Sequence, residues 1–356
     1  MDKVRLGYVG CGFMAQRVHI PNFAAVPECE FAAIAEVRRD IRESVADRYR
    51  IPKRYTTHLE MAEDDSLDAI ALSAGFALQG EMALEFLKRG KPVFMEKPMA
   101  TTVEAGKRLL EAEKQGGGRL MIGYMKRYDL GNMIARDAVR EFRASEEMGP
   151  MFYVRAHGFC GDWLGGIDTP MDKSTEDKPP SANYGPDWLP EQWRGGYIGY
   201  LQQYTHNINL VRWLLDAGDD AKVRMVDLDD DGISGVTVLE VAGVRTVIES
   251  GAVRHYGWDE HTQVFFREGW VKTSSPSLLL KNVPATVEIY KAKPTPVTSY
   301  PVPSPAWTWC YKNQAQDFVS KVISGEPFDA SAQDTLTDVR LYEEIYRDFL
   351  TRKGVL

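Results

Sequence analysis

The feature that most constrains this chain is a glycine-rich turn close to its N-terminus. Residues Val4 to Val9 form a short, mostly apolar run, and the sequence GCGFMA follows at residues 10–15. Two glycines let the chain turn sharply and let a pyrophosphate approach the backbone, while the small Ala15 permits close helix packing. The turn therefore predicts a strand, a phosphate-binding loop and a helix. A glycine turn that binds no ligand has the same appearance.

An acidic residue follows at the position where a dinucleotide site needs one. A second apolar run, Phe31 to Ala35, ends in Glu36, whose carboxylate can accept hydrogen bonds from the ribose hydroxyls of the adenosine. A carboxylate there favours NAD over NADP, because it repels a 2'-phosphate. Arg38 and Arg39 come next and could bind such a phosphate, so NADP stays an alternative. The two arginines are equally typical of a solvated helix start.

Strand-like and helix-like segments alternate along this part of the chain. Strands that alternate with helices imply a parallel, doubly wound sheet whose ligand lies at the carboxyl ends of the strands. Ser73 ends one predicted strand, and the Glu96-Lys97-Pro98 segment follows another. The predicted strands are Leu67–Ser73, Pro92–Met95 and Leu120–Tyr124, and the predicted helices are Asp40–Arg50, Glu81–Arg89 and Val103–Lys114.

Lys97 is the first candidate for acid–base chemistry. A lysine held at a strand end beside a bound nicotinamide can hydrogen-bond a substrate hydroxyl, and partial desolvation next to a positive cofactor favours its use as an acid or base. Pro98 permits a cis peptide bond, which would fix the direction of the lysine. The alternative is a surface lysine that precedes a turn-forming proline.

Five segments together resemble the glucose-fructose oxidoreductase/inositol dehydrogenase family, also called Gfo/Idh/MocA. The resemblance covers essentially the whole chain. It implies an α/β protein with an N-terminal Rossmann doubly wound parallel sheet and a C-terminal α/β domain with a large open, mainly antiparallel sheet. The segments are GYVGCGFMA at residues 7–15, AIAEVR at 33–38, GKPVFMEKPMA at 90–100, GYMKRYD at 123–129 and THNINLVRWLL at 205–215.

The resemblance also implies a division of labour along the chain. Residues 1–125 are expected to bind the dinucleotide, and residues 126–356 to bind substrate and form the oligomer, with the last helix able to pack back toward the first domain. Family members mostly oxidise or reduce a secondary alcohol of a sugar or polyol. Lys97 is expected to bind the reacting hydroxyl and His206 to relay its proton.

The residues around His206 give partial support of their own. Ile208, Val211 and Leu214 follow helical spacing, so His206 is expected at the start of an amphipathic helix that projects it into a cleft. A histidine that can gain or lose a proton near neutral pH suits this role, although a lone histidine is more often structural.

Two features depart from the family pattern. Many family dehydrogenases carry acids four residues before and three after the histidine, where this chain has Gln202 and Asn209. Amides can hydrogen-bond sugar hydroxyls but cannot stabilise an imidazolium as a carboxylate would, which weakens the proton-relay hypothesis. Leu78 stands where relatives often place a histidine near the cofactor.

The segment from Gly161 to Gly199 is long, rich in aromatic residues and without sustained periodicity. Such a segment usually lines a binding site or acts as a lid. Trp163 and Trp193 could stack on sugar rings, and Asp162 could bind hydroxyls. The alternative is a surface loop held by its aromatic residues. Later segments with alternating polarity predict antiparallel strands near residues 223–228, 233–241, 244–250, 263–266 and 286–290.

Composition limits the partners and the compartment. The 356 residues carry 43 Lys and Arg against 51 Asp and Glu, a net charge of −8, which lacks the basic excess that nucleic-acid binding needs. Four widely spaced cysteines fit a reducing cytoplasm, and no apolar stretch is long enough for a membrane helix. No spacing of histidines or cysteines predicts a metal site. A homodimer or homotetramer is expected by resemblance.

Three classes of function fit these observations. The leading hypothesis is an NAD-dependent oxidoreductase acting on a sugar, glycoside or cyclic polyol. The second is an NAD-dependent glycosidase that works by transient oxidation, elimination, water addition and re-reduction, and the third is a non-catalytic sensor. The predicted catalytic residues are Lys97 and His206; the predicted cofactor-binding residues are Gly10, Gly12, Phe13, Met14, Glu36, Arg38, Ser73, Glu96 and Lys97; the predicted substrate-binding residues are Arg127, Tyr128, Asp162, Trp163, Trp193, Gln202 and Asn209.

Overall fold

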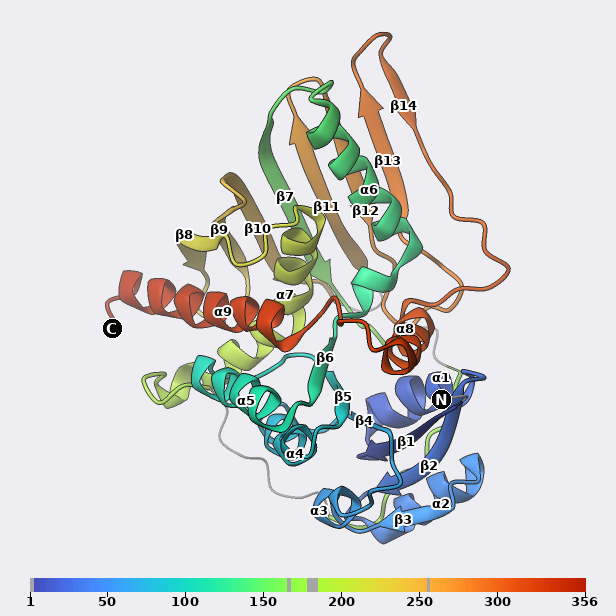
Figure 1. Ribbon diagram of the computed structural model, residues 1–356. Helices are drawn as coiled ribbons and strands as arrows, with labels where there is room; N and C mark the ends of the chain where they lie inside the picture. Colours follow the sequence, from blue (N-terminus) through green and yellow to red (C-terminus); the bar gives the residue numbers. More distant parts are fainter. Residues whose placement is uncertain (1–2, 165–167, 178–184, 255–256) are drawn as a thin grey trace. The chain divides into compact units, whose positions relative to one another are not determined.

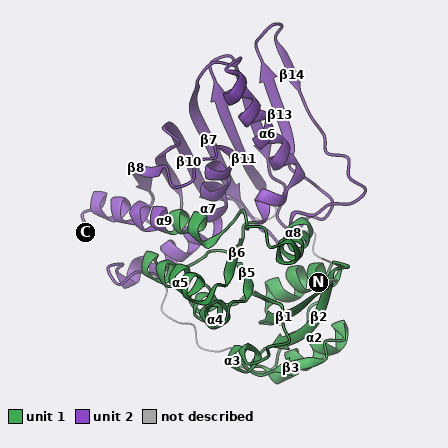
Figure 2. Ribbon diagram, viewed as in Figure 1, with its two compact units in different colours: residues 1–124, 168–184, 311–339 green, residues 125–167, 185–310, 340–356 purple. Residues whose placement is uncertain are grey.

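A computed structural model describes residues 3–164, 168–177, 185–254 and 257–356. The chain forms two compact units, shown in different colours in Figure 2. Unit 1 consists of residues 1–124, 168–184 and 311–339, and unit 2 of residues 125–167, 185–310 and 340–356. Each unit is therefore assembled from three separate stretches of the chain. The assignment of residues 1–125 to cofactor binding and of 126–356 to substrate binding and assembly stays a prediction.

Unit 1 contains a six-stranded sheet in the order β3-β2-β1-β4-β5-β6. All neighbouring strands are parallel, and the strand order reverses beside β1, which is where a doubly wound sheet binds its ligand. The predicted parallel, doubly wound sheet is thus confirmed. Its strands are β1 (Val4–Val9), β2 (Cys29–Ala35), β3 (Lys53–Tyr55), β4 (Ala69–Leu72), β5 (Pro92–Glu96) and β6 (Arg119–Gly123).

Helices connect and cover these strands (Figure 1). The hydroxyl oxygen of Thr102 accepts a hydrogen bond from the Ala105 amide and so caps one of them, as short polar residues commonly do. Leucine, valine, methionine and alanine side chains fill the core around the sheet. The helical elements are the π-helical turn η1 (Ala15–His19), α1 (Ile20–Ala24), α2 (Arg39–Tyr49), α3 (His58–Ala62), α4 (Phe76–Lys88), α5 (Val103–Gly116), α8 (Cys310–Ser324) and the first part of α9 (Ala332–Arg352), which belongs to unit 2 from Arg340 on.

Unit 2 contains an eight-stranded open sheet in the order β14-β13-β12-β11-β7-β10-β9-β8. The strands β7 and β10 are parallel, while the other neighbouring pairs are antiparallel, which confirms the predicted mainly antiparallel sheet. The strands are β7 (Met151–Cys160), β8 (Ala221–Leu228), β9 (Gly235–Val241), β10 (Val244–Ala252), β11 (Trp258–Phe266), β12 (Gly269–Ser274), β13 (Thr286–Lys291) and β14 (Val297–Ser299).

Two long helices pack on one face of this sheet (Figure 1). On α6 (Leu130–Ser145), the Asn132 carboxamide oxygen accepts a hydrogen bond of 2.6 Å from the Thr273 hydroxyl on β12. On α7 (Arg194–Leu214), the Tyr204 hydroxyl donates to the Gly158 carbonyl on β7 at 3.1 Å. Short 3-10 turns precede both helices: η2 (Met125–Tyr128) and η3 (Glu191–Trp193).

The position of His206 corrects one expectation. The helix α7 begins at Arg194, so His206 lies well inside it and not at its start, and the segment predicted to be irregular up to Gly199 ends earlier. The glycines that suggested a loop serve close packing instead: a Cβ on Gly196 would come within 2.7 Å of the Asp231 carbonyl oxygen. The closely spaced glycines therefore belong to a helix that packs tightly against a neighbouring turn. Local sequence does not distinguish such a helix from a loop.

Candidate functional site

The glycine turn of unit 1 has the geometry that a pyrophosphate requires. Gly10 has a φ of 95°, and a Cβ there would lie 2.3 Å from the Ser73 carbonyl oxygen, so no other residue fits without strain. A Cβ on Gly12 would meet nothing within 4 Å, which leaves open space against the backbone. The turn leads through the partly exposed Phe13 and Met14 into η1. The residues present fit a dinucleotide phosphate.

Glu36 lies at the end of the neighbouring strand β2 and is held by several donors. Its carboxylate accepts the Cys11 amide at 2.8 Å and the Arg38 guanidinium at 2.7 and 3.0 Å. Burial raises the pKa of Glu36, but the hydrogen bonds from Arg38 and Cys11 outweigh it and hold the pKa below its usual value. An ionised carboxylate thus lies beside the glycine turn, paired with the arginine that sequence analysis offered as a phosphate ligand.

Lys97 follows β5, at the same edge of the sheet as these residues. Its ammonium lies 5.7 Å from the centre of the Phe76 ring, at the start of α4. The Lys97–Pro98 peptide bond is cis. Ser73, after β4, is buried and shares a hydrogen bond of 2.9 Å with the Tyr8 hydroxyl. The carboxyl ends of β1, β2, β4 and β5 thus carry the predicted cofactor residues and Lys97 to one edge.

Sequence analysis missed Gln79, a buried residue that fixes the backbone on both sides of Lys97. Its side-chain nitrogen donates to the Glu96 carbonyl at 2.6 Å and to the Pro98 carbonyl at 2.8 Å. A flipped amide would place an oxygen against two carbonyl oxygens, so the orientation follows from the contacts. The signal available in the sequence was a polar residue on the apolar face of α4.

His19 holds the side chain that precedes Lys97. Its Nε2 lies 2.9 Å from Glu96 Oε1, and both residues are buried. The ring of His19 also packs against Phe94, with 5.3 Å between ring centres. Glu96, predicted to bind cofactor, is therefore engaged with η1, and it connects the element after the glycine turn to the strand that presents Lys97.

Unit 2 contains a second group of functional candidates, a buried polar cluster formed by η2, α7 and β11. The guanidinium of Arg127 donates to Asn209 at 2.8 Å, which brings together two residues predicted to bind substrate. Tyr128 is also buried in η2. We define the polar cluster as six residues of these elements, each at most 5% exposed: Lys126, Arg127, His206, Asn207, Asn209 and Glu260.

Three members of this cluster were not predicted. Lys126 forms an ion pair with Glu260 on β11, and Asn207 donates to the same carboxylate oxygen at 3.3 Å. The other Glu260 oxygen, Oε2, is buried and has no hydrogen-bond partner among the described residues. Glu260 lies three residues before the predicted strand 263–266, and only the longer β11 places it in the sheet, so the sequence analysis had no signal for it.

The remaining predicted substrate residues do not gather at this cluster. Gln202 is exposed on α7. Asp162 accepts the Leu164 amide at 2.8 Å, which is a local turn contact. Trp193 packs edge-on against Phe349 with 5.1 Å between ring centres, and Trp163 is half-buried. Residues 165–167 and 178–184 of the predicted aromatic loop lie outside the described residues.

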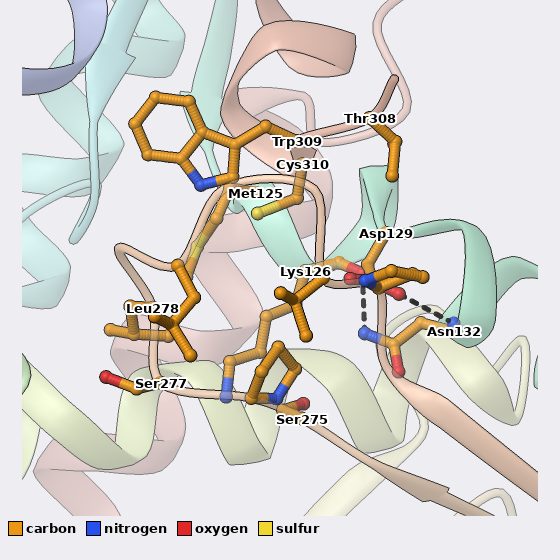
Figure 3. Close-up of a pocket in the computed structure, with 14 residues that line it drawn as sticks. Met125, Lys126, Asp129, Asn132, Ser275, Ser277, Leu278, Thr308, Trp309 and Cys310 are labelled. Atoms are coloured by element: carbon orange, nitrogen blue, oxygen red, sulfur yellow. Dashed lines mark hydrogen bonds between the residues drawn. The ribbon is translucent and has the colours of Figure 1, made fainter. Parts of the chain in front are cut away.

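A small cavity lies beside the polar cluster (Figure 3). Lys126, Asp129 and Asn132 line one side, and Ser277 and Trp309 another. Its volume of about 20 Å³ is enough for about one water molecule, so this cavity does not hold a sugar. Burial raises the pKa of Asp129. Hydrogen bonds from the Ala285, Asn132 and Gly131 amides lower it, but by less.

Neither a metal-binding group nor a membrane-spanning helix is present among the described residues. They contain no group of three or more histidine, cysteine, aspartate or glutamate side chains placed to hold a metal ion. Within the same residues, no helix combines the length and the apolar character needed to span a bilayer.

Comparison with known proteins identifies relatives of this chain. A family profile described as an oxidoreductase family with an NAD-binding Rossmann fold, GFO_IDH_MocA, matches residues 4–124. The inositol 2-dehydrogenase of Agrobacterium fabrum is 27% identical over 77% of this chain and 74% of its own. The inositol 2-dehydrogenase of Salmonella typhimurium is 25% identical over 75% of this chain and 72% of its own.

Solved structures share the fold over nearly the whole chain. The aldose-aldose oxidoreductase from Caulobacter crescentus has a TM-score of 0.74 and 21% identity, and the match covers 99% of this chain and 98% of that one. A 3-ketoreductase from Actinomadura kijaniata in complex with NADP has a TM-score of 0.71 and 19% identity, with 98% of each chain covered.

Proposed function

From the match of residues 4–124 to the Gfo/Idh/MocA family of oxidoreductases with an NAD-binding Rossmann fold, we propose that the chain transfers a hydride between nicotinamide and a secondary alcohol. The proposed substrate class is a sugar, a glycoside or a cyclic polyol. The inositol 2-dehydrogenases among its relatives support a ring that carries several hydroxyls. The observation that carries the proposal is the position of Lys97 after β5, at the sheet edge that also holds the glycine turn and Glu36.

In the proposed reaction, Lys97 handles the proton of the reacting hydroxyl. A bound nicotinamide supplies the ring carbon that takes or gives the hydride. In the oxidative direction Lys97 Nζ binds the hydroxyl and accepts its proton as the C–H bond breaks, and in the reductive direction it returns the proton. Gln79 holds the backbone on both sides of this lysine, and His19 holds the side chain of the preceding Glu96.

We assign the second proton-handling role to His206 and substrate binding to the polar cluster of unit 2. A histidine can gain or lose a proton near neutral pH, as a relay requires. Asn209 and Arg127 offer a carboxamide and a guanidinium for sugar hydroxyls, while the Lys126–Glu260 pair keeps the cluster rigid. Because Gln202 and Asn209 replace acids, Lys97 carries more of the proton transfer in this proposal.

We further propose that NAD is the preferred cofactor. The ionised carboxylate of Glu36 lies where the adenosine ribose binds, and it would repel a 2'-phosphate. Arg38 is engaged with this carboxylate at 2.7 Å, so it must leave Glu36 before it can bind a phosphate. Four donors from Cys11 and Arg38 already occupy the Glu36 carboxylate, so ribose hydroxyls must displace one of them as well, and the preference for NAD rests on the repulsion between this carboxylate and a 2'-phosphate.

A substrate screen with two readouts tests the proposed reaction. Purified protein and NAD are incubated with inositols, free pyranoses and aryl glycosides, and both NADH formation and aglycone release are measured. Net NADH formation in proportion to consumed polyol is the expected result. Aglycone release without net NADH, together with solvent deuterium beside the oxidised carbon, would instead identify the glycosidase. Cofactor binding without turnover on the whole panel would favour a sensor.

A further inference from the structure

Part of the predicted aromatic loop belongs to unit 1 and not to the unit from which it emerges. Residues 168–177 lie in the sequence between β7 and α7, which are elements of unit 2, yet they belong to unit 1 and hydrogen-bond to Gln16 and α2. We call residues 168–177 the strap. The strap is anchored at two places, the element that follows the glycine turn and the helix that follows Glu36.

The first anchor is Gln16, one residue beyond the GCGFMA turn. Its amide group pairs with the backbone of Asp172 in both directions: the Asp172 amide donates to Oε1 at 2.8 Å, and Nε2 donates to the Asp172 carbonyl at 3.1 Å. Nε2 also donates to the Cys11 carbonyl at 2.8 Å. Gln16 is 1% exposed. A buried side chain therefore connects the strap directly to the phosphate-binding turn.

The second anchor is the helix α2, which follows Glu36 and Arg38. The Asp172 carboxylate accepts the Ser44 hydroxyl at 2.5 Å and the Arg48 guanidinium at 2.6 Å. Charged partners make such hydrogen bonds stronger than neutral ones. Asp172 thus contacts Gln16, just after the glycine turn, through its backbone and α2 through its side chain.

Further contacts extend this second anchor to the first turn of α2. The Asp40 carboxylate accepts the Ser174 hydroxyl at 2.7 Å and the Thr175 amide at 2.7 Å, and the Asp40 amide donates to Glu176 at 2.8 Å. The hydrogen bonds from Ser174 and Thr175 lower the pKa of Asp40, and those from Ser44 and Arg48 lower the pKa of Asp172. Both anchoring carboxylates are therefore ionised at neutral pH.

The two anchors define what the strap encloses. In a Rossmann unit the pyrophosphate binds at the first turn, and the adenosine ribose binds the acid at the end of the second strand. The strap bonds to the element after the first turn and to the helix after that acid. We propose that the strap closes the adenosine half of the site and slows the release of any ligand that contains ADP-ribose. This rests on dinucleotide binding by unit 1 and not on the substrate.

The dissociation rate of NADH tests this proposal without a substrate. The variant Asp172→Ala removes the contacts to Ser44 and Arg48 but leaves the backbone pairing with Gln16. The matched control is Asp177→Ala, an exposed aspartate of the same segment. Stopped-flow fluorescence after mixing the NADH complex with excess NAD gives the rate. We expect Asp172→Ala to speed release about five- to tenfold, with the control near the wild-type rate.

A second ligand locates the effect. ADP-ribose lacks the nicotinamide, so a strap over the adenosine half predicts the same loss of affinity for ADP-ribose as for NADH in Asp172→Ala. Hydrogen exchange adds an independent readout, since amides of residues 170–177 should gain protection when NADH binds. Equal NADH release from both variants, or a loss confined to NADH, would overturn the proposal. If both ligands respond as expected while no polyol is oxidised, the strap stands and the proposed reaction fails.

Discussion

In unit 1 the candidate residues follow the carboxyl ends of strands in one parallel sheet, whereas in unit 2 they come from η2, α7 and β11, which lie far apart in the sequence. A parallel sheet places every strand end at the same edge, so motifs that follow strands must be neighbours. No such rule applies to the mixed sheet of unit 2. Motif order therefore locates a site in the first unit but not in the second.

The two groups also differ in how deeply their lysines are buried. Lys97 is half-buried, while Lys126 is buried and forms an ion pair with Glu260. A charge that is partly solvated can be removed at little cost to folding, but a buried ion pair cannot lose one partner cheaply. We therefore expect changes in unit 1 to affect turnover and changes in the unit 2 cluster to affect stability as well.

The largest expected effect is that of Lys97→Met. Loss of the group that handles the hydroxyl proton should lower kcat for any polyol that the wild type oxidises by about 10³-fold or more. The urea midpoint of unfolding should change little, because Lys97 is half-buried, and the dissociation constant for NADH reports how much Lys97 also contributes to cofactor binding. Steady-state kinetics, fluorescence titration and urea unfolding measure the three quantities. A fall in stability as large as the fall in kcat would remove the contrast between the units.

The variant Lys126→Met makes the opposite prediction. It leaves the Glu260 carboxylate buried without its cation, which should destabilise the protein by about 3–5 kcal/mol in urea unfolding. The control Arg108→Met breaks an ion pair with Glu81 that is about half exposed, and it should cost at most about 1 kcal/mol. Similar losses of unfolding free energy in the two variants would show that the buried ion pair in unit 2 contributes no more to stability than the exposed one.

The fold was largely predictable because its signals are local. Apolar runs followed by turns gave the strands of unit 1, and alternation gave several strands of unit 2, but not β7, β12 or β14. The pairing partners of β7 are distant in sequence, whereas β12 forms a hairpin with β11, so distance in sequence explains only the first of these misses. The start of α7 was misplaced because Gly196 and Gly199 suggested a loop, while only the tertiary contact with the 231–233 turn explains them.

The candidate site was predictable only where one residue type identifies the chemistry. Glycines with open space, an acid after β2 and a lysine after β5 each have a chemical reason to stand where they do. Gln79, His19 and Glu260 act through side-chain contacts with residues 17 to 134 positions away, and no local pattern marks such partners. The roles of Lys97, His206 and the other site residues stay predictions that the variants here test.

His206→Asn sharpens the comparison from the side of unit 2. As a proton relay, His206 should contribute about 10²-fold to kcat, less than Lys97, because amides replace the acids that would support an imidazolium. His206 is 2% exposed and lies within α7, so the variant should also lower the urea midpoint of unfolding. The pH profile of kcat separates the two effects: loss of a relay changes its shape, while a purely structural role lowers it uniformly.

The smallest expected effect is that of Gln79→Met, which keeps the side-chain length but removes both donors to the carbonyls beside Lys97. The backbone around Lys97 should then become less well positioned, and kcat should fall about tenfold while KM changes less. Gln115→Met is the matched control, since Gln115 is exposed and its side chain donates to Glu111 on the same helix. If Gln79→Met lowers stability but leaves kcat and its pH profile at the wild-type values, Gln79 supports the fold alone. Unit 1 would then position its lysine through the strand end itself, without the help of a buried amide.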